Sequence, residues 1–154
     1  MKRTVALAAC AAFLAGVTPR VNAEPLVDVT VQNGWSRPAI DTAVVYAVVR
    51  NGGATPLLLV GASSQVAQSA ELHQSMSMSA GKMDGAAMSA MGMQPVARLE
   101  IPPHGTLTLK PGSYHLMLLG LRQPLAAGQR FMVTLLFAGG VSKTFLVQVE
   151  NRGF

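Results

Sequence analysis

The feature that most restricts the fold of this chain is a series of short β-prone runs separated by turn-forming residues. In LVDVTVQ (26–32) apolar and polar residues alternate, and TAVVYAVVRN (42–51) is rich in β-branched residues. Similar runs follow at residues 57–62, 70–73, 97–101, 105–110, 114–119, 131–137 and 142–150. Many short strands at close spacing predict an all-β domain, a β-sandwich or barrel with Greek-key connections.

The residues between these runs suit tight turns. Lys110-Pro111-Gly112-Ser113 places Pro and Gly at the two central positions that a type II turn prefers. A helical period does not persist anywhere, and the best candidate, residues 118–128, is interrupted by Pro124. We therefore expect no long helix in the domain.

The first 23 residues predict a cleaved signal peptide. Lys2 and Arg3 precede an apolar run from Val5 to Val17, and Val21-Asn22-Ala23 resembles a cleavage site. The run is too short to span a bilayer. An alternative is a lipobox at Leu7-Ala8-Ala9-Cys10, although it leaves about five apolar residues before the cysteine, which is few for an export signal.

Residues 24–154 then form the mature domain, which we expect to be a periplasmic monomer without a membrane span, in a Gram-negative bacterium. Signal-peptide removal takes three of the twelve basic residues and none of the seven acidic ones, so the net charge becomes 9 − 7 = +2. No basic cluster suggests nucleic acid as a partner. Because Cys10 is the only cysteine, the mature chain has no disulfide and no thiolate.

Residues 74–94 form a segment rich in Ser, Ala, Gly and Met. Six of the twenty-one residues from His73 to Met93 are methionine. The segment has too few branched apolar residues for a strand and too much Gly and Ser for a stable helix. We expect a loop here, and a long loop in a compact domain is usually functional or disordered.

The alternation of the strands predicts which side chains share a face. In the run 114–119, Tyr114, Leu116 and Leu118 suit the core, so His115 and Met117 lie together on the other face. In the run 70–73, Leu72 suits the core, and Glu71 and His73 point outward. The Met-rich loop begins directly after His73, so two outward histidines and several thioethers converge.

Imidazole and thioether groups together suit Cu(I), a soft ion, and methionine is not lost to disulfide formation in an oxidising compartment. Other interpretations remain open. Met117 could be a core residue, and His73 and His115 could be solvated surface histidines. The loop methionines could be a docking surface for a partner or a target for oxidation. No spacing of Ser, His and Asp indicates a hydrolase, and we do not expect an enzyme.

At these residues the chain resembles the PCuAC family of periplasmic copper chaperones. The family has a histidine, a methionine later in a loop, 21 intervening residues and then His-x-Met. Here Met93 is followed by 21 residues and by His115-Leu116-Met117. Trp35-Ser36-Arg37, Ala70-Glu71-Leu72-His73 and Leu109 to Leu118 also match. The resemblance covers about residues 29–149, but nineteen residues separate His73 from Met93, where the family has about ten.

The resemblance implies a cupredoxin-like β-sandwich that binds Cu(I) through His73, Met93, His115 and Met117. The longer loop leaves Met91, Met78 and Met76 as possible auxiliary ligands. We take Trp35 as structural or as a shield for the metal.

The family passes copper to the copper A site of cytochrome c oxidase, in subunit II, often alongside a Sco-type protein. Two alternatives are copper storage or detoxification, in which the extra methionines bind several ions, and a metal-free interaction module whose Met-rich loop docks a partner.

Overall fold

The computed structural model describes residues 28–76 and 92–152, and β-strands make up most of this part of the chain. The strands are β1 (Val29–Ser36), β2 (Ala43–Asn51), β3 (Leu57–Ser63), β4 (Ala67–Met76), β5 (Gly92–Pro95), β6 (Leu99–Ile101), β7 (Thr106–Leu109), β8 (Tyr114–Leu121), β9 (Arg130–Phe137) and β10 (Ser142–Val149). A short 3-10 turn, η1 (Ala138–Gly140), joins β9 to β10. Within the described residues no helix has the length and apolar character needed to cross a membrane.

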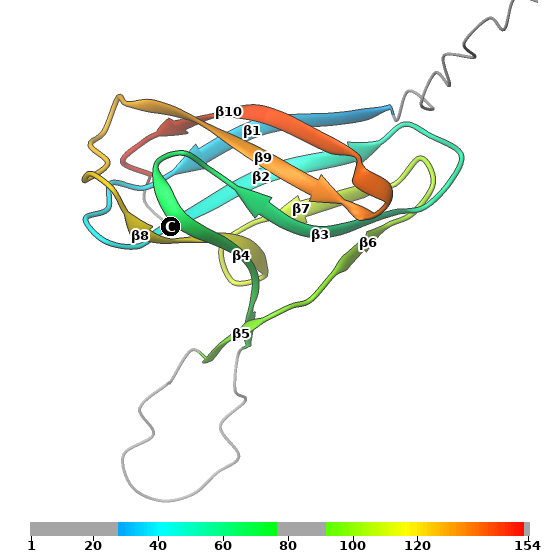
Figure 1. Cartoon of the computed structure of the whole chain (residues 1–154), viewed down its shortest axis with the longest axis horizontal. Coiled ribbons are helices and arrows are strands. Elements are labelled where there is room, and N and C mark those ends of the chain that lie inside the picture. The colour runs from blue at the N-terminus through cyan, green and yellow to red at the C-terminus, as the bar shows by residue number, and fades with distance from the viewer. Residues whose placement is uncertain (1–27, 77–91, 153–154) are drawn as a thin grey trace, which may run out of the picture.

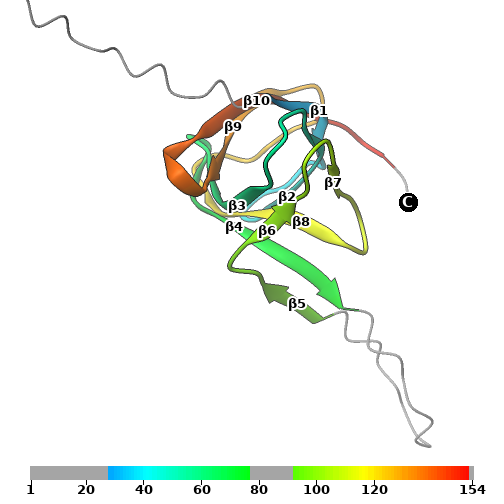
Figure 2. The same cartoon turned by 90° about the vertical axis from the view of Figure 1, so that its right-hand side faces the viewer.

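The strands form one sheet that closes into a barrel. Their order is β5-β4-β8-β2-β1-β10-β9-β3-β6, with β7 paired to β2, and closure comes from a further pairing between β3 and β4. Figure 1 shows the barrel from the side, and Figure 2 shows it turned by 90°. The β1–β10 pair is parallel and the other pairs are antiparallel. Strands distant in sequence, such as β4 and β8, are neighbours, and the expected all-β architecture is confirmed.

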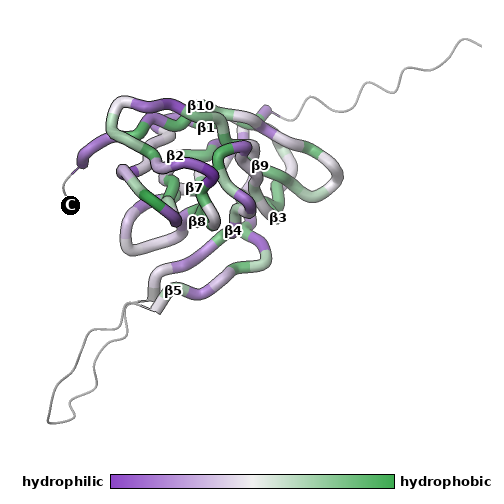
Figure 3. Tube along the Cα trace, turned by 60° about the vertical axis from the view of Figure 1, so that its left-hand side comes forward, coloured by the Kyte–Doolittle hydropathy of each residue, from purple (hydrophilic) through white to green (hydrophobic). Residues whose placement is uncertain are grey.

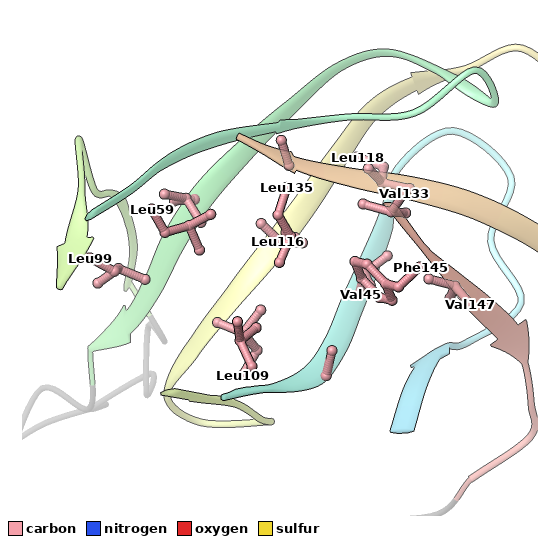
Figure 4. Packing of buried hydrophobic residues seen from close by; sticks show 14 of the residues in the cluster. Val45, Leu59, Leu99, Leu109, Leu116, Leu118, Val133, Leu135, Phe145 and Val147 are labelled. Carbon is pink, nitrogen blue, oxygen red and sulfur yellow. The ribbon is translucent and has the colours of Figure 1, made fainter. Parts of the chain in front are cut away.

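The inner face of the barrel carries the hydrophobic core. Val45, Leu59, Leu116, Leu118 and Leu135 are fully buried and come from four strands. Figure 4 shows these side chains pointing toward one another, and Figure 3 shows hydrophobic and hydrophilic residues interspersed along the strands. Because a strand sends alternate residues to opposite faces, this inner row fixes which residues of β4 and β8 lie on the outer face.

Two strand boundaries differ from the sequence-based expectation. The first strand, expected over residues 26–32, continues past Gln32 through Trp35 to Ser36, and residues 26 and 27 lie outside the described part of the chain. The segment 74–94, expected to be a loop, is strand at both described ends, where Gln74 pairs with Gln94 and Met76 with Gly92. The expectation of a loop was wrong there because backbone pairing to a neighbouring strand needs no branched side chains. Residues 77–91 lie outside the described part of the chain.

The turn before β8 is confirmed. Gly112 has a φ of 75°, as the third residue of a type II turn requires, and the Ser113 N–H donates to the Lys110 carbonyl over 3.2 Å. This turn brings the chain from β7 into β8, so it sets the point at which Tyr114 and His115 enter the sheet.

Asn51 is a buried polar residue that ties the end of β2 to the neighbouring turns, with 1% of its surface exposed. Its Nδ2 lies within 3.2 Å of three backbone carbonyls, those of Thr55, Ile101 and Pro102, and its Oδ1 accepts from the Gly53 N–H.

We predict that Asn51→Ala destabilises the protein by about 2 kcal/mol, because buried carbonyls lose their donor. Urea denaturation measures the change. Asn151→Ala, at an exposed position, is the matched control and should alter stability by less than about 0.5 kcal/mol. Equal effects at both positions would contradict the prediction.

Candidate metal centre

Two histidines from different strands meet on the outer face of the barrel. His73 on β4 lies directly opposite His115 on β8, and the centroids of their rings are 6.0 Å apart. The next residues along β8, Leu116 and Leu118, point into the core. The face predicted for each histidine from strand alternation is therefore confirmed, and the antiparallel register places the two imidazoles side by side.

Although both histidines lie on the outer face, they are buried. His115 is 2% exposed and His73 is 9% exposed. This burial contradicts the alternative that His73 and His115 are solvated surface histidines. Aromatic rings explain part of the burial: Tyr46 on β2 lies 6.5 Å from His115, and Trp35 on β1 lies 4.6 Å from Tyr46, centroid to centroid. Four rings thus form a row across four adjacent strands.

The ring row also places Trp35, which the sequence left as either structural or a metal shield. Tyr46 stands between Trp35 and the histidines, and the guanidinium carbon of Arg152 lies 4.9 Å above the Trp35 ring. Tyr46 is therefore the aromatic residue next to the site, and sequence reasoning missed it. Burial raises the pKa of its phenol above the usual value, with Arg37 acting in the opposite direction.

Each histidine has one ring nitrogen in a hydrogen bond and one without a partner. His73 Nε2 lies 3.0 Å from Glu71 Oε2, and His115 Nδ1 lies 3.1 Å from the Ser113 carbonyl oxygen. His73 Nδ1 and His115 Nε2 are both buried and have no hydrogen-bond partner. Unpaired buried polar atoms are costly, and their presence often marks a site for an absent ligand. Two such nitrogens on facing rings suit a metal ion.

The methionine of the His-x-Met motif lies beside this pair. Met117 is half-buried, lies two residues from His115 on the same face, and is directly opposite Glu71. It is therefore a diagonal cross-strand neighbour of His73, with a typical Cα separation of about 7–8 Å, within reach of a long side chain. Its place on the outer face agrees with the predicted alternation and contradicts the interpretation of Met117 as a core residue.

Met93 lies on β5, opposite Ser75 of β4, and is 47% exposed. It is the other diagonal neighbour of His73, because Ser75 and Glu71 lie two residues to either side of that histidine. The two methionines thus flank His73 from opposite directions along β4. All four residues predicted as ligands share one face of the sheet within a single cross-strand or diagonal step of His73.

Of the three methionines predicted as auxiliary ligands, only Met76 lies in the described part of the chain. Met76 ends β4 opposite Gly92, whereas Met78 and Met91 lie outside the described residues. His104, the third histidine, is exposed in the turn before β7 and is not near this site in the pairing of the strands.

The chemistry of these donors fits a soft ion. Within residues 28–76 and 92–152, no group of three or more His, Cys, Asp or Glu side chains could hold a metal. The thioethers that the strand pairing brings beside the two histidines are those of Met117 and Met93. Imidazole and thioether ligands suit Cu(I) far better than Ca²⁺ or Mg²⁺, which prefer oxygen.

The pKa of His115 lies below its usual value, and burial is the largest cause. The hydrogen bond to the Ser113 carbonyl acts in the opposite direction and raises this pKa, whereas the charge on His73 lowers it. The folded protein then binds fewer protons here than the unfolded chain, in which a histidine titrates at about 6.5. The contribution of His115 to the free energy of unfolding is therefore fully present above about pH 6.5, and it is lost as the pH falls through the folded-state pKa.

We therefore predict that the metal-free protein becomes less stable between pH 7.5 and pH 5.5, and that His115→Gln reduces this dependence. Urea denaturation at both pH values measures it. An unchanged pH dependence in the variant would assign the effect to other groups.

Comparison with known proteins finds one matching family model, one curated relative and several similar solved structures. The model of the LpqE-like family of putative lipoproteins matches residues 29–149. The putative lipoprotein Lxx21020 of Leifsonia xyli subsp. xyli is 33% identical over 124 residues, which are 80% of this chain and 70% of that protein.

Solved structures resemble the fold. The copper-bound PCuAC domain from PmoF2 has a TM-score of 0.62 at 21% identity, covering 80% of this chain and 93% of that domain. The solution structure of CuI-DR1885 from Deinococcus radiodurans has a TM-score of 0.55 at 30% identity, covering 84% of this chain and 81% of that protein. The solution structure of apo-DR1885 has a TM-score of 0.59 at 27% identity, covering 99% of this chain and 97% of that protein.

Proposed function

Because the chain belongs to the LpqE-like family and has the cupredoxin-like fold of the PCuAC copper-binding domains, we propose that it is a Cu(I) metallochaperone. In this proposal Cu(I) is a cargo that the protein binds outside the cytoplasm and passes to a copper protein. His73, His115 and Met117 form the holding site, and Met93 completes it from β5.

The observation that carries the proposal is the pair of facing, buried imidazoles with one unpartnered nitrogen each. Two neutral imidazoles and two thioethers would hold Cu(I) without a buried excess of negative charge. CuI-DR1885, which is 30% identical to this chain, is named as a Cu(I) form, and this supports Cu(I) as the cargo.

The composition favours transport over redox catalysis. A blue-copper electron-transfer site uses a cysteine thiolate, and the chain from residue 24 onward contains no cysteine. Thioether ligands can be exchanged one at a time with those of a docking partner, and Met93 is exposed enough for such an exchange. We therefore propose a non-enzymatic carrier.

For the recipient we propose a copper enzyme of the cell envelope, and the first candidate is the copper A site in subunit II of cytochrome c oxidase. A Sco-type protein is the second proposed partner in this delivery. The proposed export rests on the signal peptide that the sequence predicts for residues 1–23, and the periplasm is the proposed compartment.

The names of the matched family and relative, both putative lipoproteins, support the alternative of lipid attachment at Cys10. Mass spectrometry of the mature N-terminus separates the two processing routes. A chain that begins at Glu24 means signal-peptide cleavage, and an acylated chain that begins at Cys10 means a lipid anchor.

An anaerobic titration of residues 24–154 with Cu(I), against a colorimetric competitor ligand, tests the function. One tight equivalent supports a chaperone. Several equivalents would instead favour storage or detoxification by the additional methionines. The absence of competition would overturn the copper proposal and leave the Met-rich segment as a docking surface for another protein.

A further inference from the structure

Glu71 is the one side chain that hydrogen-bonds a ring nitrogen of the histidine pair in the described residues, and the proposed ligand set does not use it. It lies two residues before His73 on β4, so the two side chains share a face. The carboxylate Oε2 is 3.0 Å from His73 Nε2, and the side chain of Glu71 is 47% exposed against 11% for His73.

This contact fixes the tautomer of His73. An ionised carboxylate can only accept a hydrogen bond, so Nε2 must carry the proton. In the neutral imidazole the lone pair is then on Nδ1, which is the buried nitrogen without a partner. The hydrogen bond thus leaves the unpartnered atom ready to bind a metal.

The other histidine has the opposite arrangement. The Ser113 carbonyl can only accept, so His115 Nδ1 carries the proton and Nε2 has the lone pair. This Nε2 is also buried without a partner. The two facing rings therefore offer different nitrogens, and each choice is set by a group two residues earlier in the chain.

We propose that Glu71 is a positioning residue that commits His73 to bind Cu(I) through Nδ1, while the Ser113 carbonyl commits His115 to bind through Nε2. This inference rests on the proposed function. A carboxylate behind a ligating imidazole orients the ring and raises its basicity, and loss of such a partner typically lowers metal affinity by about 10–100-fold.

Glu71 is not itself a ligand in this proposal. Cu(I) is soft and a carboxylate is hard. Within the described residues, moreover, His73, His115 and Glu71 do not form a three-residue metal-binding group. The carboxylate lies on the far side of the His73 ring from Nδ1, where its charge can offset that of the bound ion without contacting it.

The test begins with the metal-free protein. Long-range ¹H–¹⁵N NMR correlations at pH 8 distinguish a protonated from an unprotonated ring nitrogen. The expected result is the Nε2–H tautomer at His73 and the Nδ1–H tautomer at His115. In Glu71→Ala, His73 should become a mixture of tautomers while His115 is unchanged. The opposite tautomer at His73 in the wild-type protein would overturn the proposal.

The second measurement is the anaerobic Cu(I) competition on the same variants. Glu71→Ala should bind about tenfold more weakly than wild type, and Glu100→Ala, at an exposed carboxylate on β6, should bind like wild type. Wild-type affinity and an unchanged tautomer in Glu71→Ala would overturn this proposal alone. No Cu(I) binding by the wild-type protein would overturn it together with the proposed function, whatever the tautomers.

Discussion

Replacing His115 and Met117 together by alanine is expected to remove tight Cu(I) binding, with a loss of affinity of at least about a hundredfold. His115 supplies one of the two imidazole nitrogens of the histidine pair that are buried without a partner, and Met117 is the thioether next to it on the same strand. Loss of one hydrogen-bond partner behind a ligand already costs about 10–100-fold, and this variant removes two direct donors. The anaerobic competition titration measures the change.

The matched control for that variant is His104→Asn with Met132→Ala. It also removes one histidine and one methionine, but from the exposed turn before β7 and from the exposed outer face of β9. Asparagine is chosen because His104 has a φ of 54°, which Asn tolerates better than Ala. We expect the control to bind Cu(I) like wild type. Equal losses in the two variants would place copper elsewhere on the molecule.

Leu116→Ala is expected to destabilise the protein by about 3 kcal/mol. Leu116 is fully buried, lies opposite Val45 of β2 and Leu72 of β4, and stands between His115 and Met117 in the chain. Removal of a buried leucine side chain costs about 2–5 kcal/mol, because apolar contacts are lost and a cavity remains. The urea midpoint of the metal-free protein, at constant m-value, measures the effect.

Leu119→Ala is the matched control on the same strand. Leu119 is half-buried and lies on the outer face, so its truncation should cost about 1 kcal/mol or less. A larger effect at Leu119 than at Leu116 would contradict the assignment of the two faces of β8.

Much of the local structure could be predicted from the sequence because strand alternation is a local property. The run 114–119 placed Leu116 and Leu118 in the core and His115 and Met117 opposite, and the structure has this arrangement. The turn from Lys110 to Ser113 was equally local, since Pro and Gly restrict the backbone themselves.

Three features could not be read from the sequence. The burial of His115 depends on Tyr46, which belongs to another strand, 69 positions earlier in the numbering. Strand β5 forms by backbone pairing with β4, and the pattern of apolar residues gives no sign of that pairing. The pairing of Glu71 with His73 was partly visible, because the sequence placed both on one outward face, but the contact itself requires the rotamers of the folded chain.

The sequence by itself determined the kinds of donor available and which of them share a face. From residue 24 onward it offers histidine and methionine without a thiol, alternating with core leucines on short strands. Those facts depend on composition and on a two-residue period, both of which are local.

Only the tertiary structure decided that His73 and His115, 42 positions apart, lie opposite each other, and that one nitrogen of each is left without a partner. Register and burial arise from the closure of the whole barrel. Each strand must pair its backbone on both sides while its apolar face fills a common interior. The sequence of a single strand does not specify which strands become its neighbours or in which register they pair.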